Sequence, residues 1–424
     1  MYFDYPYDIP ENIYSGDFLI ATYLVSGISR SGIIKKAGSF AIGQSIGTWL
    51  PLPGITKQMV EQYQARVIGL YPMPEVPGVE PFFILQVAFP SQNTSDSFAM
   101  MLTALVGNDV STSLNLRLLD ISMTPTALGR YQGPQRGTQG VRNFLGVMDR
   151  PLLLNMLKPS LGMAPDEAAH LFYEIGMGGV DIVKDDEVLG SVPVSGVVDR
   201  VKAFSPAAKR VFEESGNKML YIPNVSSSPK RMRNNIQAAI SEGAHAVMIN
   251  FVVTGLDAMA DVSEEFGDNL VILGHYAGIG SMQSEQGGIA PAVMIGYLAR
   301  LAGADMVMTM FAEKKDPNGY FNFIQTVQKQ KFPLGRIKPV LNTVGGGVSP
   351  LNAGKLIEEI GIDLVLGVGG AIQGHPMGAR EGAKAVRAAM SSAVAGTSLE
   401  SAAQDCPALK KAIEIWGPKG QEKA

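Results

Sequence analysis

Cysteine is almost absent from this sequence. Cys406 is the single cysteine among 424 residues. One thiol excludes a disulfide within the chain and a zinc site built from several cysteines. Proteins without disulfides are typical of reducing compartments, so we expect a cytoplasmic protein.

An excess of either charge is also missing. The formal net charge is −4, only 17% of the residues are charged, and no long run of Lys or Arg occurs. This composition excludes the basic surface with which proteins bind nucleic acid or acidic membranes. We therefore expect a small-molecule substrate.

Long hydrophobic runs are absent, although 46% of the residues are hydrophobic. No stretch of about 18 uninterrupted apolar residues occurs, as a membrane span would need. The start, Met1–Tyr7, lacks the basic and apolar regions of a signal peptide, so we expect neither export nor a membrane span. The apolar residues suffice for a barrel beside a smaller domain.

From residue 152 onward, short apolar runs alternate with longer amphipathic stretches, as in βα units with a parallel sheet. The eight expected strands are Leu152–Leu157, Val180–Val183, Met219–Ile222, Ala246–Phe251, Leu270–Leu273, Met306–Met310, Pro339–Leu341 and Leu364–Val368. Helix-like stretches between and after them include Asp166–Ile175, Pro229–Ser241, Ala290–Leu301, Asn352–Ile360 and Arg380–Val394. Eight such units in series predict a closed (β/α)₈ barrel.

A doubly wound open sheet is the competing fold. That fold typically has a Gly-rich dinucleotide loop after its first strand, and Leu157–Gly162 lacks the required glycine spacing. Strand count and site placement favour the barrel.

Residues 1–145 lack the alternating rhythm. Their strand-like and helix-like segments are Phe18–Val25, Arg66–Leu70, Phe82–Phe89 and Ser95–Leu105. We expect a small α+β domain of ferredoxin-like type over residues 1–145, followed by the barrel over residues 146–424.

Polar side chains follow the expected barrel strands, and a barrel of this type has its active site at the C-terminal ends of its strands. These residues are Lys158, Lys184, Asp185, Asp186, Glu187, Asn224, Asn250 and His275. Strand alternation places Lys184 and Asp186 on one face, and Glu187 can turn inward where the strand ends. Asp186 and Glu187 are oxygen ligands suited to Mg²⁺.

The alternative interpretation of Lys184–Glu187 is a solvated charge run. The preceding Gly178 and Gly179 and the buried character of the strand count against it.

Glycines follow the last two expected strands. Gly345–Gly347 and Gly369–Gly370 offer backbone N–H groups, and the corresponding barrel loops often bind phosphate. Ordinary turn glycines are the alternative.

His275 and Lys158 are candidates for proton transfer. His275 could also be a packed structural histidine. Lys158 follows a strongly apolar strand, where burial near a metal would lower its pKa enough for a base role, although a surface lysine remains possible. His375, beyond the last strand, is interpreted as structural.

The segment Gly178–Glu187 resembles the metal-binding signature of the RuBisCO large-subunit superfamily. The resemblance extends over most of the chain, including Gly47–Trp49, Gly107–Asn108, Leu157–Pro159, His275 and Gly369–Gly378. It implies a carbamate formed by CO₂ on Lys184, which would bind Mg²⁺ together with Asp186 and Glu187.

The same resemblance implies a homodimer, or a multiple of dimers. In the family pattern, Gly346, Gly347, Gly369 and Gly370 hold a phosphate together with Thr48 and Trp49 of the other protomer. Asn108 of that protomer would reach the substrate.

Departures from the family pattern restrict the substrate. Tyr276, Met308 and Gly345 stand where the carboxylases have the Arg, His and Ser of a second phosphate site. Losing these charge-assisted contacts indicates a substrate with one phosphate.

The carboxylases also have a lysine where Ser160 stands. Their mobile loop is flanked by glycines, whereas Phe311–Asp316 is not, although Lys315 falls near the loop lysine by spacing. The resemblance therefore indicates a RuBisCO-like protein of form IV and not a CO₂-fixing carboxylase.

The superfamily shares formation of an enediolate stabilised by Mg²⁺. The first domain and Arg150–Leu154 most resemble methionine-salvage enolases acting on a diketo-methylthiopentyl phosphate, which carry a lysine base where Asn108 stands. Without that base, either Lys158 abstracts the proton, or the enolate forms by loss of CO₂ or by C–C cleavage.

The second route resembles relatives that process phosphorylated 3-oxo-isoapionate. It makes decarboxylation or related cleavage of a phosphorylated keto-sugar acid the favoured interpretation. Enolisation or isomerisation of a phosphorylated ketose, as by a diketo-methylthiopentyl phosphate enolase or a methylthioribulose phosphate isomerase, is the alternative. A non-catalytic binding protein is the third hypothesis, against which retention of the site residues argues.

Overall fold

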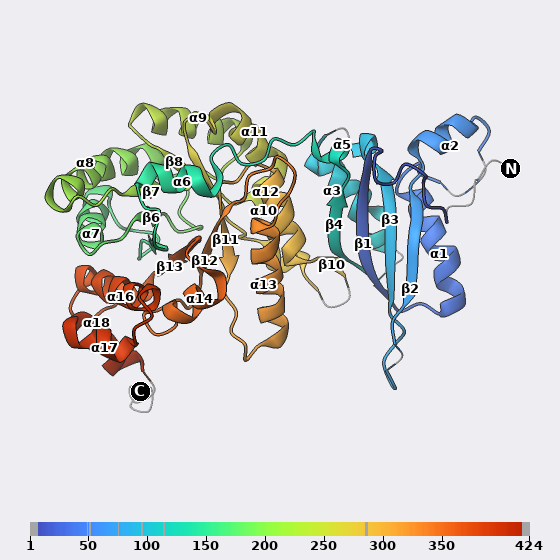
Figure 1. The fold of residues 1–424 in the computed structure, drawn as a ribbon. Coiled ribbons are helices and arrows are strands. Elements are labelled where there is room, and N and C mark those ends of the chain that lie inside the picture. The colour runs from blue at the N-terminus through green and yellow to red at the C-terminus, as the bar shows by residue number, and fades with distance from the viewer. Residues whose placement is uncertain are drawn as a thin grey trace.

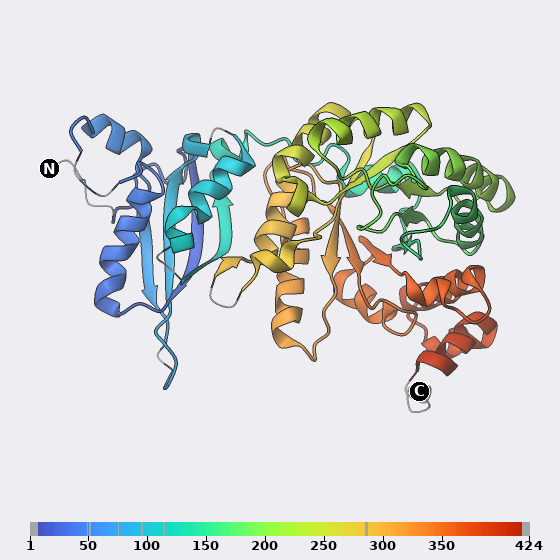
Figure 2. The same cartoon turned by 180° about the vertical axis from the view of Figure 1, so that it is seen from behind.

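The computed structural model describes residues 7–48, 50, 52–74, 76–94, 96–112, 115–284 and 287–417. The chain forms two parts that lie side by side, an N-terminal domain and a larger barrel (Figure 1). Seen from behind, helices surround the strands of the barrel (Figure 2). Within the described residues, no helix has both the length and the apolar character needed to cross a membrane.

The N-terminal domain has a ferredoxin-like sheet. Its strands are β1 (Phe18–Ser26), β2 (Arg66–Pro72), β3 (Phe83–Pro90) and β4 (Asn115–Met123), in the order β4-β1-β3-β2. Along β1, buried side chains alternate with partly exposed ones, so one face of the strand packs into the core. The helical segments are α1 (Arg30–Gly43), α2 (Lys57–Tyr63), η1 (Ser91–Thr94), α3 (Phe98–Val106), α4 (Asn108–Thr112) and α5 (Pro125–Leu128).

The second part is an eight-stranded parallel sheet closed into a barrel, as the sequence predicts. Its strands are β5 (Leu152–Met156), β6 (Ile182–Lys184), β7 (Leu220–Ile222), β8 (Ala246–Ile249), β9 (Val271–Gly274), β11 (Met306–Met310), β12 (Leu341–Gly345) and β13 (Leu364–Gly367). The hydrogen-bonded strand order is β7-β6-β5-β13-β12-β11-β9-β8. A bridge between Asn224 and Met248 joins β7 to β8 and closes the ring.

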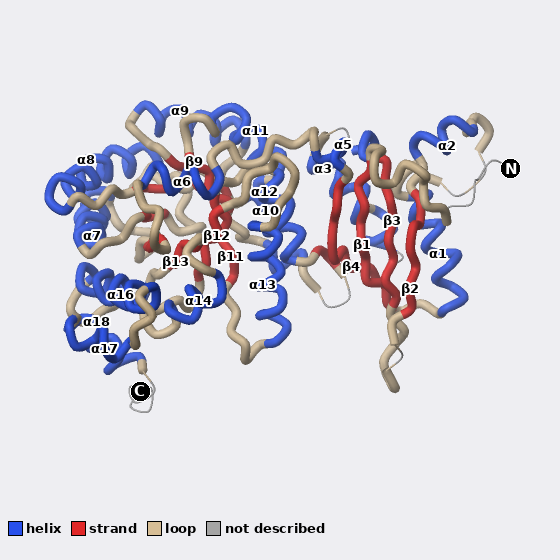
Figure 3. Tube along the Cα trace, in the orientation of Figure 1, coloured by secondary structure: helices blue, strands red, loops and turns tan. Residues whose placement is uncertain are grey.

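Helices cover the outside of the barrel (Figure 3). They are α7 (Pro165–Met177), α8 (Val197–Ser215), α9 (Pro229–Ser241), α10 (Phe251–Thr254), α11 (Leu256–Phe266), α12 (Ala299–Leu301), α13 (Pro317–Lys331), α14 (Ala353–Ile360), α15 (Gly370–Gln373), α16 (Ala379–Val394), α17 (Leu399–Asp405) and α18 (Pro407–Trp416). A 3₁₀ turn, η2 (Ile279–Met282), and a π-helical segment, η3 (Ala292–Leu298), complete the set.

A closed apolar cluster fills the barrel interior. Inward side chains such as Leu152, Leu154 and Ile182 pack together with Val141 and Leu145 of α6 (Gly137–Leu145). Helix α6 therefore packs against the apolar cluster in the barrel interior. The division of the chain at residues 145 and 146 stays a prediction.

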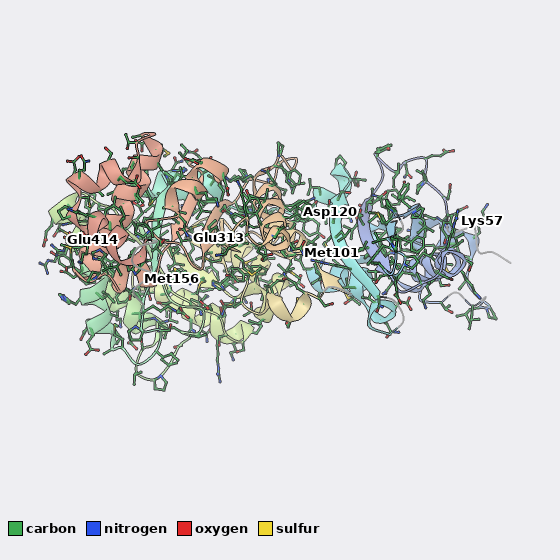
Figure 4. All side chains as sticks on the ribbon, turned by 90° about the horizontal axis from the view of Figure 1, so that it is seen from below. Lys57, Met101, Asp120, Met156, Glu313 and Glu414 are labelled. Atoms are coloured by element: carbon green, nitrogen blue, oxygen red, sulfur yellow. The ribbon has the colours of Figure 1, made fainter. Side chains whose placement is uncertain are left out.

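A strand pairing, hydrogen bonds and an ion pair connect the two domains. The two-residue strand β10 (Gly288–Ile289), which belongs to the barrel half of the sequence, pairs in parallel with β4 (Figure 1). The Asp257 carboxylate accepts hydrogen bonds from the N–H groups of Phe98 and Ala99 at 2.8 Å, at the start of α3. Asp120, labelled near the junction in Figure 4, forms an ion pair with Lys329 at 2.5 Å.

Several expected elements differ in their bounds from the observed ones, among them one strand and one helix of the barrel. The run Pro339–Leu341 overlaps its strand only at Leu341, because β12 continues through the polar but fully buried Asn342 and Thr343. Asn342 Nδ2 donates to Thr309 Oγ1 at 3.0 Å, which explains how a polar residue is accommodated. The expected helix Ala290–Leu301 begins as a π-helix at Ala292 and becomes α-helical only at Ala299.

Candidate active site at the barrel mouth

At the end of β6 and just after it, successive side chains point to opposite sides of the barrel wall. Lys184 is 1% exposed and belongs to the interior, and Asp186 is also buried. Asp185, between them, binds Arg200 of α8 and the hydroxyl of Tyr221 of β7. Strand alternation thus brings Lys184 and Asp186 to the same face, as predicted from the sequence.

The Lys184 ammonium lies among carboxylates. Its Nζ donates to the carbonyl of Asp185 at 2.9 Å and lies 4.0 Å from Glu187 Oε2. Burial lowers the pKa of Lys184 to about 8, while the charges of Glu187, Asp186 and Asp185 act in the opposite direction.

Lys158, at the end of β5, contacts the next carboxylate. Its Nζ forms an ion pair with Asp186 and lies 3.2 Å from Ser160 Oγ. Burial acts to raise the pKa of Asp186, but hydrogen bonds from Lys158 and the N–H of Val188, with the charges of Lys158 and Lys184, together lower it. The structure therefore brings Lys158, Lys184 and Asp186 together.

Glu187 is held through its backbone and leaves its carboxylate accessible. Its carbonyl accepts hydrogen bonds from Asn224 Nδ2 and Asn250 Nδ2, each at 3.0 Å. Its side chain is 38% exposed, and Oε2 lies 3.6 Å from His275 Nε2. Asn224 and Asn250, which follow β7 and β8, thus orient the loop that carries Glu187.

His275 follows β9 and lies buried beside this group. Burial, together with the charge of Lys184, lowers the pKa of His275 to about 3, so the ring is neutral near pH 7. The N–H of Ala277 donates to Nδ1 at 3.1 Å, which leaves the ring proton on Nε2, facing Glu187. The ring of Tyr276 stacks on His275 at a centroid distance of 5.0 Å.

Asp185 belongs to a buried network behind the barrel wall. Its carboxylate accepts from Arg200 Nη2 at 2.8 Å, from the Tyr221 hydroxyl at 2.7 Å and from the N–H of Asn224 at 2.8 Å. The sequence analysis did not identify Arg200. The signal was an arginine on the apolar face of α8, between the buried Val197 and Phe204.

The predicted phosphate glycines lie beside one another across two strands. Gly346 and Gly347 follow β12 and have positive φ angles of 88° and 76°, and Gly369 and Gly370 follow the neighbouring β13. A Cβ atom at Gly346, Gly347 or Gly370 would meet nothing within 4 Å. The backbone there borders open space, as close approach of a ligand to the main chain requires.

The positions that the family resemblance assigns to a second phosphate site, Tyr276, Met308 and Gly345, have an apolar lining. A Cβ atom added to Gly345 would meet Met308 Cε at 2.7 Å and Met156 Cε at 3.8 Å. Tyr276 and Met156, which is labelled in Figure 4, pack against the interior cluster that contains Met308. Thioether and aromatic groups therefore occupy this side of the mouth.

Gln373 of α15 was missed by the sequence analysis. Its Nε2 donates to Asn155 Oδ1 at 2.6 Å and to the carbonyl of Met156 at 2.8 Å, and its Oε1 accepts the N–H of Lys158 at 2.9 Å. The available signal was its position three residues after Gly370. Gln373 connects the loop of Lys158 to the loop of the predicted phosphate glycines.

Other predicted residues lie outside this cluster. Lys315 is 82% exposed and forms an ion pair with Glu313 of its own loop at 2.9 Å. Thr48 and Asn108 line a cavity of about 640 Å³ to which only residues of the N-terminal domain contribute. Trp49 lies outside the described residues. His375 is buried against the carbonyl of Ala408 at 3.0 Å, consistent with its structural interpretation.

Two family models match this chain. The model of the ribulose bisphosphate carboxylase large chain, N-terminal domain, matches residues 8–127, and the model of its catalytic domain matches residues 137–416.

Individual relatives match nearly the whole chain. A ribulose bisphosphate carboxylase-like protein of Archaeoglobus fulgidus is 34% identical over 420 residues, which cover 97% of this chain and 96% of the relative. A 2,3-diketo-5-methylthiopentyl-1-phosphate enolase of Geobacillus thermodenitrificans is 32% identical, with 94% and 98% covered. The dimeric archaeal Rubisco of Hyperthermus butylicus superimposes with a TM-score of 0.87 at 29% identity, with 95% and 96% covered. The chain therefore belongs to the RuBisCO large-chain family, and RuBisCO-like proteins are among its relatives.

Proposed function

We propose that the chain is a Mg²⁺-dependent enzyme that forms an enediolate from a singly phosphorylated ketone. The observation that carries this proposal is the grouping of Lys158, Lys184, Asp186 and Glu187 at the barrel mouth. Family membership supports an enzyme, since relatives at similar identity are named as enolases.

The donor set fits Mg²⁺ if Lys184 carries a carbamate. Within the described ranges, no three His, Cys, Asp or Glu side chains gather closely enough to hold an ion. Asp186 and Glu187 supply two carboxylates, and CO₂ added to neutral Lys184 Nζ would supply a third, with release of one proton. Asn250, whose Nδ2 donates to the carbonyl of Glu187, has a buried Oδ1 without a hydrogen-bond partner, so this oxygen can accept from a donor or face an added positive group.

When bound, Mg²⁺ stabilises the negative charge that develops on the enediolate oxygens. Lys158 would then hold or move a proton at its Nζ, close to Asp186. Neutral His275 would donate through Nε2 to a substrate oxygen, since burial disfavours its charged form. Gly346, Gly347, Gly369 and Gly370 would offer N–H groups to the phosphate.

A single phosphate is supported by the apolar side of the mouth. Met308, Met156 and Tyr276 offer no charged donor for a second phosphate, which needs charge-assisted hydrogen bonds. Carboxylation of a bisphosphate is therefore not part of the proposal, and the exposed Lys315 is assigned no step in it.

We favour loss of CO₂, or C–C cleavage of a phosphorylated keto-sugar acid related to 3-oxo-isoapionate 4-phosphate, as the source of the enediolate. Breaking that bond leaves its electron pair on the substrate without a base. This route suits a chain that has Asn108 where the enolases of the family carry a lysine.

Enolisation or isomerisation of a phosphorylated ketose is the second candidate, with Lys158 as the base. Two observations favour it: the 32% identity to a diketo-methylthiopentyl phosphate enolase, and the methionine and tyrosine side chains at the mouth, which suit an apolar substrate end.

We further propose a homodimer or a multiple of dimers. Thr48 and Asn108 line a cavity formed only by the N-terminal domain, so they would complete the barrel mouth of another protomer together with Trp49. The structural similarity to a dimeric Rubisco supports this arrangement.

The test is a screen of monophosphorylated ketoses and keto-sugar acids with Mg²⁺ and bicarbonate, followed by NMR in D₂O. Release of CO₂ before any deuterium enters the substrate supports cleavage, whereas deuterium wash-in without CO₂ release supports enolisation. With ¹³C-bicarbonate, we expect a carbamate signal on Lys184.

A pair of matched lysine variants tests whether turnover and the carbamate signal depend on Lys184. Lys184→Met should abolish both turnover and the carbamate signal, and Lys230→Met, exposed on α9, should change neither. If the chain binds neither Mg²⁺ nor any phosphorylated sugar of the screen, the third hypothesis, a non-catalytic binding protein, is favoured instead.

A further inference from the structure

A second cavity lies on the outside of the barrel, away from the mouth. It has a volume of about 520 Å³ and is bounded by α8, by the start of β7 and by the turn that leads into β8. This volume is in the range of small-molecule sites, whereas packed interiors leave few voids larger than a water molecule.

The walls of the cavity are aromatic. Phe204 and Tyr221 form an edge-to-face pair with ring centroids 4.5 Å apart. Phe144 and Phe212 also line the cavity, and Phe212 remains 54% exposed. The cavity therefore offers aromatic rings as contact surface to a ligand.

The ionisable groups of the cavity have one sign. Lys209, Lys218 and His245 line it, and none of its lining residues is Asp or Glu. Lys218 Nζ lies 4.0 Å above the ring of Phe144, whereas Lys209 pairs with Glu213 at 3.7 Å on the solvent side. Burial and the charge of Lys218 lower the pKa of His245, so the lysines carry the positive charge near pH 7.

Helix α8 carries a proline beside the cavity. Pro206 lies inside the helix and has no N–H to donate to the carbonyl four residues earlier. Lining residues lie on both sides of this interruption, Val201 and Phe204 before it and Ala208 after it.

We propose that this cavity binds a small amphipathic anion, an aromatic ring system with one carboxylate. The ring would lie against Phe144 and Tyr221, which line the cavity and are partly exposed, and the carboxylate would pair with Lys218. Tyr221 donates to Asp185 at 2.7 Å, so the ligand would contact the side chain that supports the segment of Lys184. The proposal does not depend on the reaction at the barrel mouth.

The test uses 1-naphthoate as the probe and isothermal titration calorimetry on the full chain. We expect one site per chain with a Kd on the order of 1 mM or tighter. The cation 1-naphthylmethylammonium, which has the same ring system, should bind at least about tenfold more weakly. Equal affinity for the anion and the cation would contradict the proposal.

Variants locate the probe. Lys218→Met keeps most of the aliphatic stem and should weaken binding by about tenfold, and Ala208→Trp should abolish it by filling the cavity. Lys230→Met, on the exposed side of α9, is the charge-matched control and should leave the Kd unchanged.

Several outcomes would overturn the proposal. One is unchanged affinity in folded Lys218→Met, which remains decisive if Ala208→Trp fails to fold. Another is saturation at more than one site, which indicates an adventitious apolar surface. A third is that the wild type does not bind the probe while Ala208→Trp changes the oligomeric state. That result would mean that a second copy of the chain occupies the cavity.

Discussion

The backbone N–H of Lys158 donates to Oε1 of Gln373 at 2.9 Å, so one side chain of α15 holds the loop of the candidate base. The Nε2 of Gln373 in turn donates to Asn155 Oδ1 and to the carbonyl of Met156. Gln373 therefore links the end of β5 to the glycines after β13.

Replacing Gln373 should loosen this loop. Gln373→Leu removes three hydrogen bonds, and we expect the free energy of unfolding to fall by about 2 to 3 kcal/mol. Hydrogen exchange at the Lys158 amide should accelerate. Gln373→Glu is the matched variant, because it keeps the acceptor for Lys158 N–H and loses both donations. Unchanged exchange in Gln373→Leu would show that the loop is held by other contacts.

The pair of Arg200 and Asp185 should show strong coupling. Arg200→Met leaves the fully buried carboxylate of Asp185 without its guanidinium, and we expect a loss of about 3 to 5 kcal/mol in urea unfolding. The double variant Asp185→Asn with Arg200→Met should lose less than the sum of the single losses. Additive losses would mean that the ion pair does not set the local stability.

Gly345 should accept a methyl group at a small cost set by Met308. Gly345→Ala brings a Cβ atom to 2.7 Å from Met308 Cε, the end of a flexible side chain that must shift, and we expect a cost of about 1 kcal/mol. In a Met308→Val background that cost should shrink. Gly354→Ala is the control, because its Cβ would lie at an ordinary 3.5 Å from Ala393. The same cost in both backgrounds would exclude this contact as the cause.

Asp305 should make stability depend on pH. Burial raises the pKa of Asp305 from 3.8 to about 6, although its carboxylate accepts the N–H groups of Arg136, Gly137 and Ile272. The folded state therefore binds a proton more tightly than the unfolded state. The contribution of this group to stability is fully present below about pH 4 and is lost as the pH rises through 6.

The difference in unfolding free energy between the wild type and Asp305→Asn measures this effect. We expect it to change by roughly 2 kcal/mol between pH 4 and pH 7, in favour of the wild type at the lower pH. Asp261→Asn, on the exposed side of α11, is the control. A difference that stays constant with pH would show that Asp305 keeps one charge state throughout.

The positions of the barrel strands were largely predictable, because a buried strand is usually a short run of apolar residues. The run Met306–Met310 is apolar and coincides with β11. The prediction was wrong where the buried strand residues are polar. Asn342 is of a type common in loops, yet its side-chain amide donates a hydrogen bond to Thr309 within the barrel wall. Helix α8, which contains Pro206, was not among the helix-like stretches named from the sequence.

The sequence by itself determined the two domain types, the family and the residue types of the candidate site. Those properties follow from hydrophobic periodicity and from a contiguous motif, Lys184–Glu187. Only the tertiary structure decided which side chains meet: Lys158 with Asp186, Gln373 with Lys158, and Arg200 with Asp185. These partners lie 28, 215 and 15 residues apart. They meet because the closed barrel brings the strand ends into one ring, and no local pattern specifies those individual contacts.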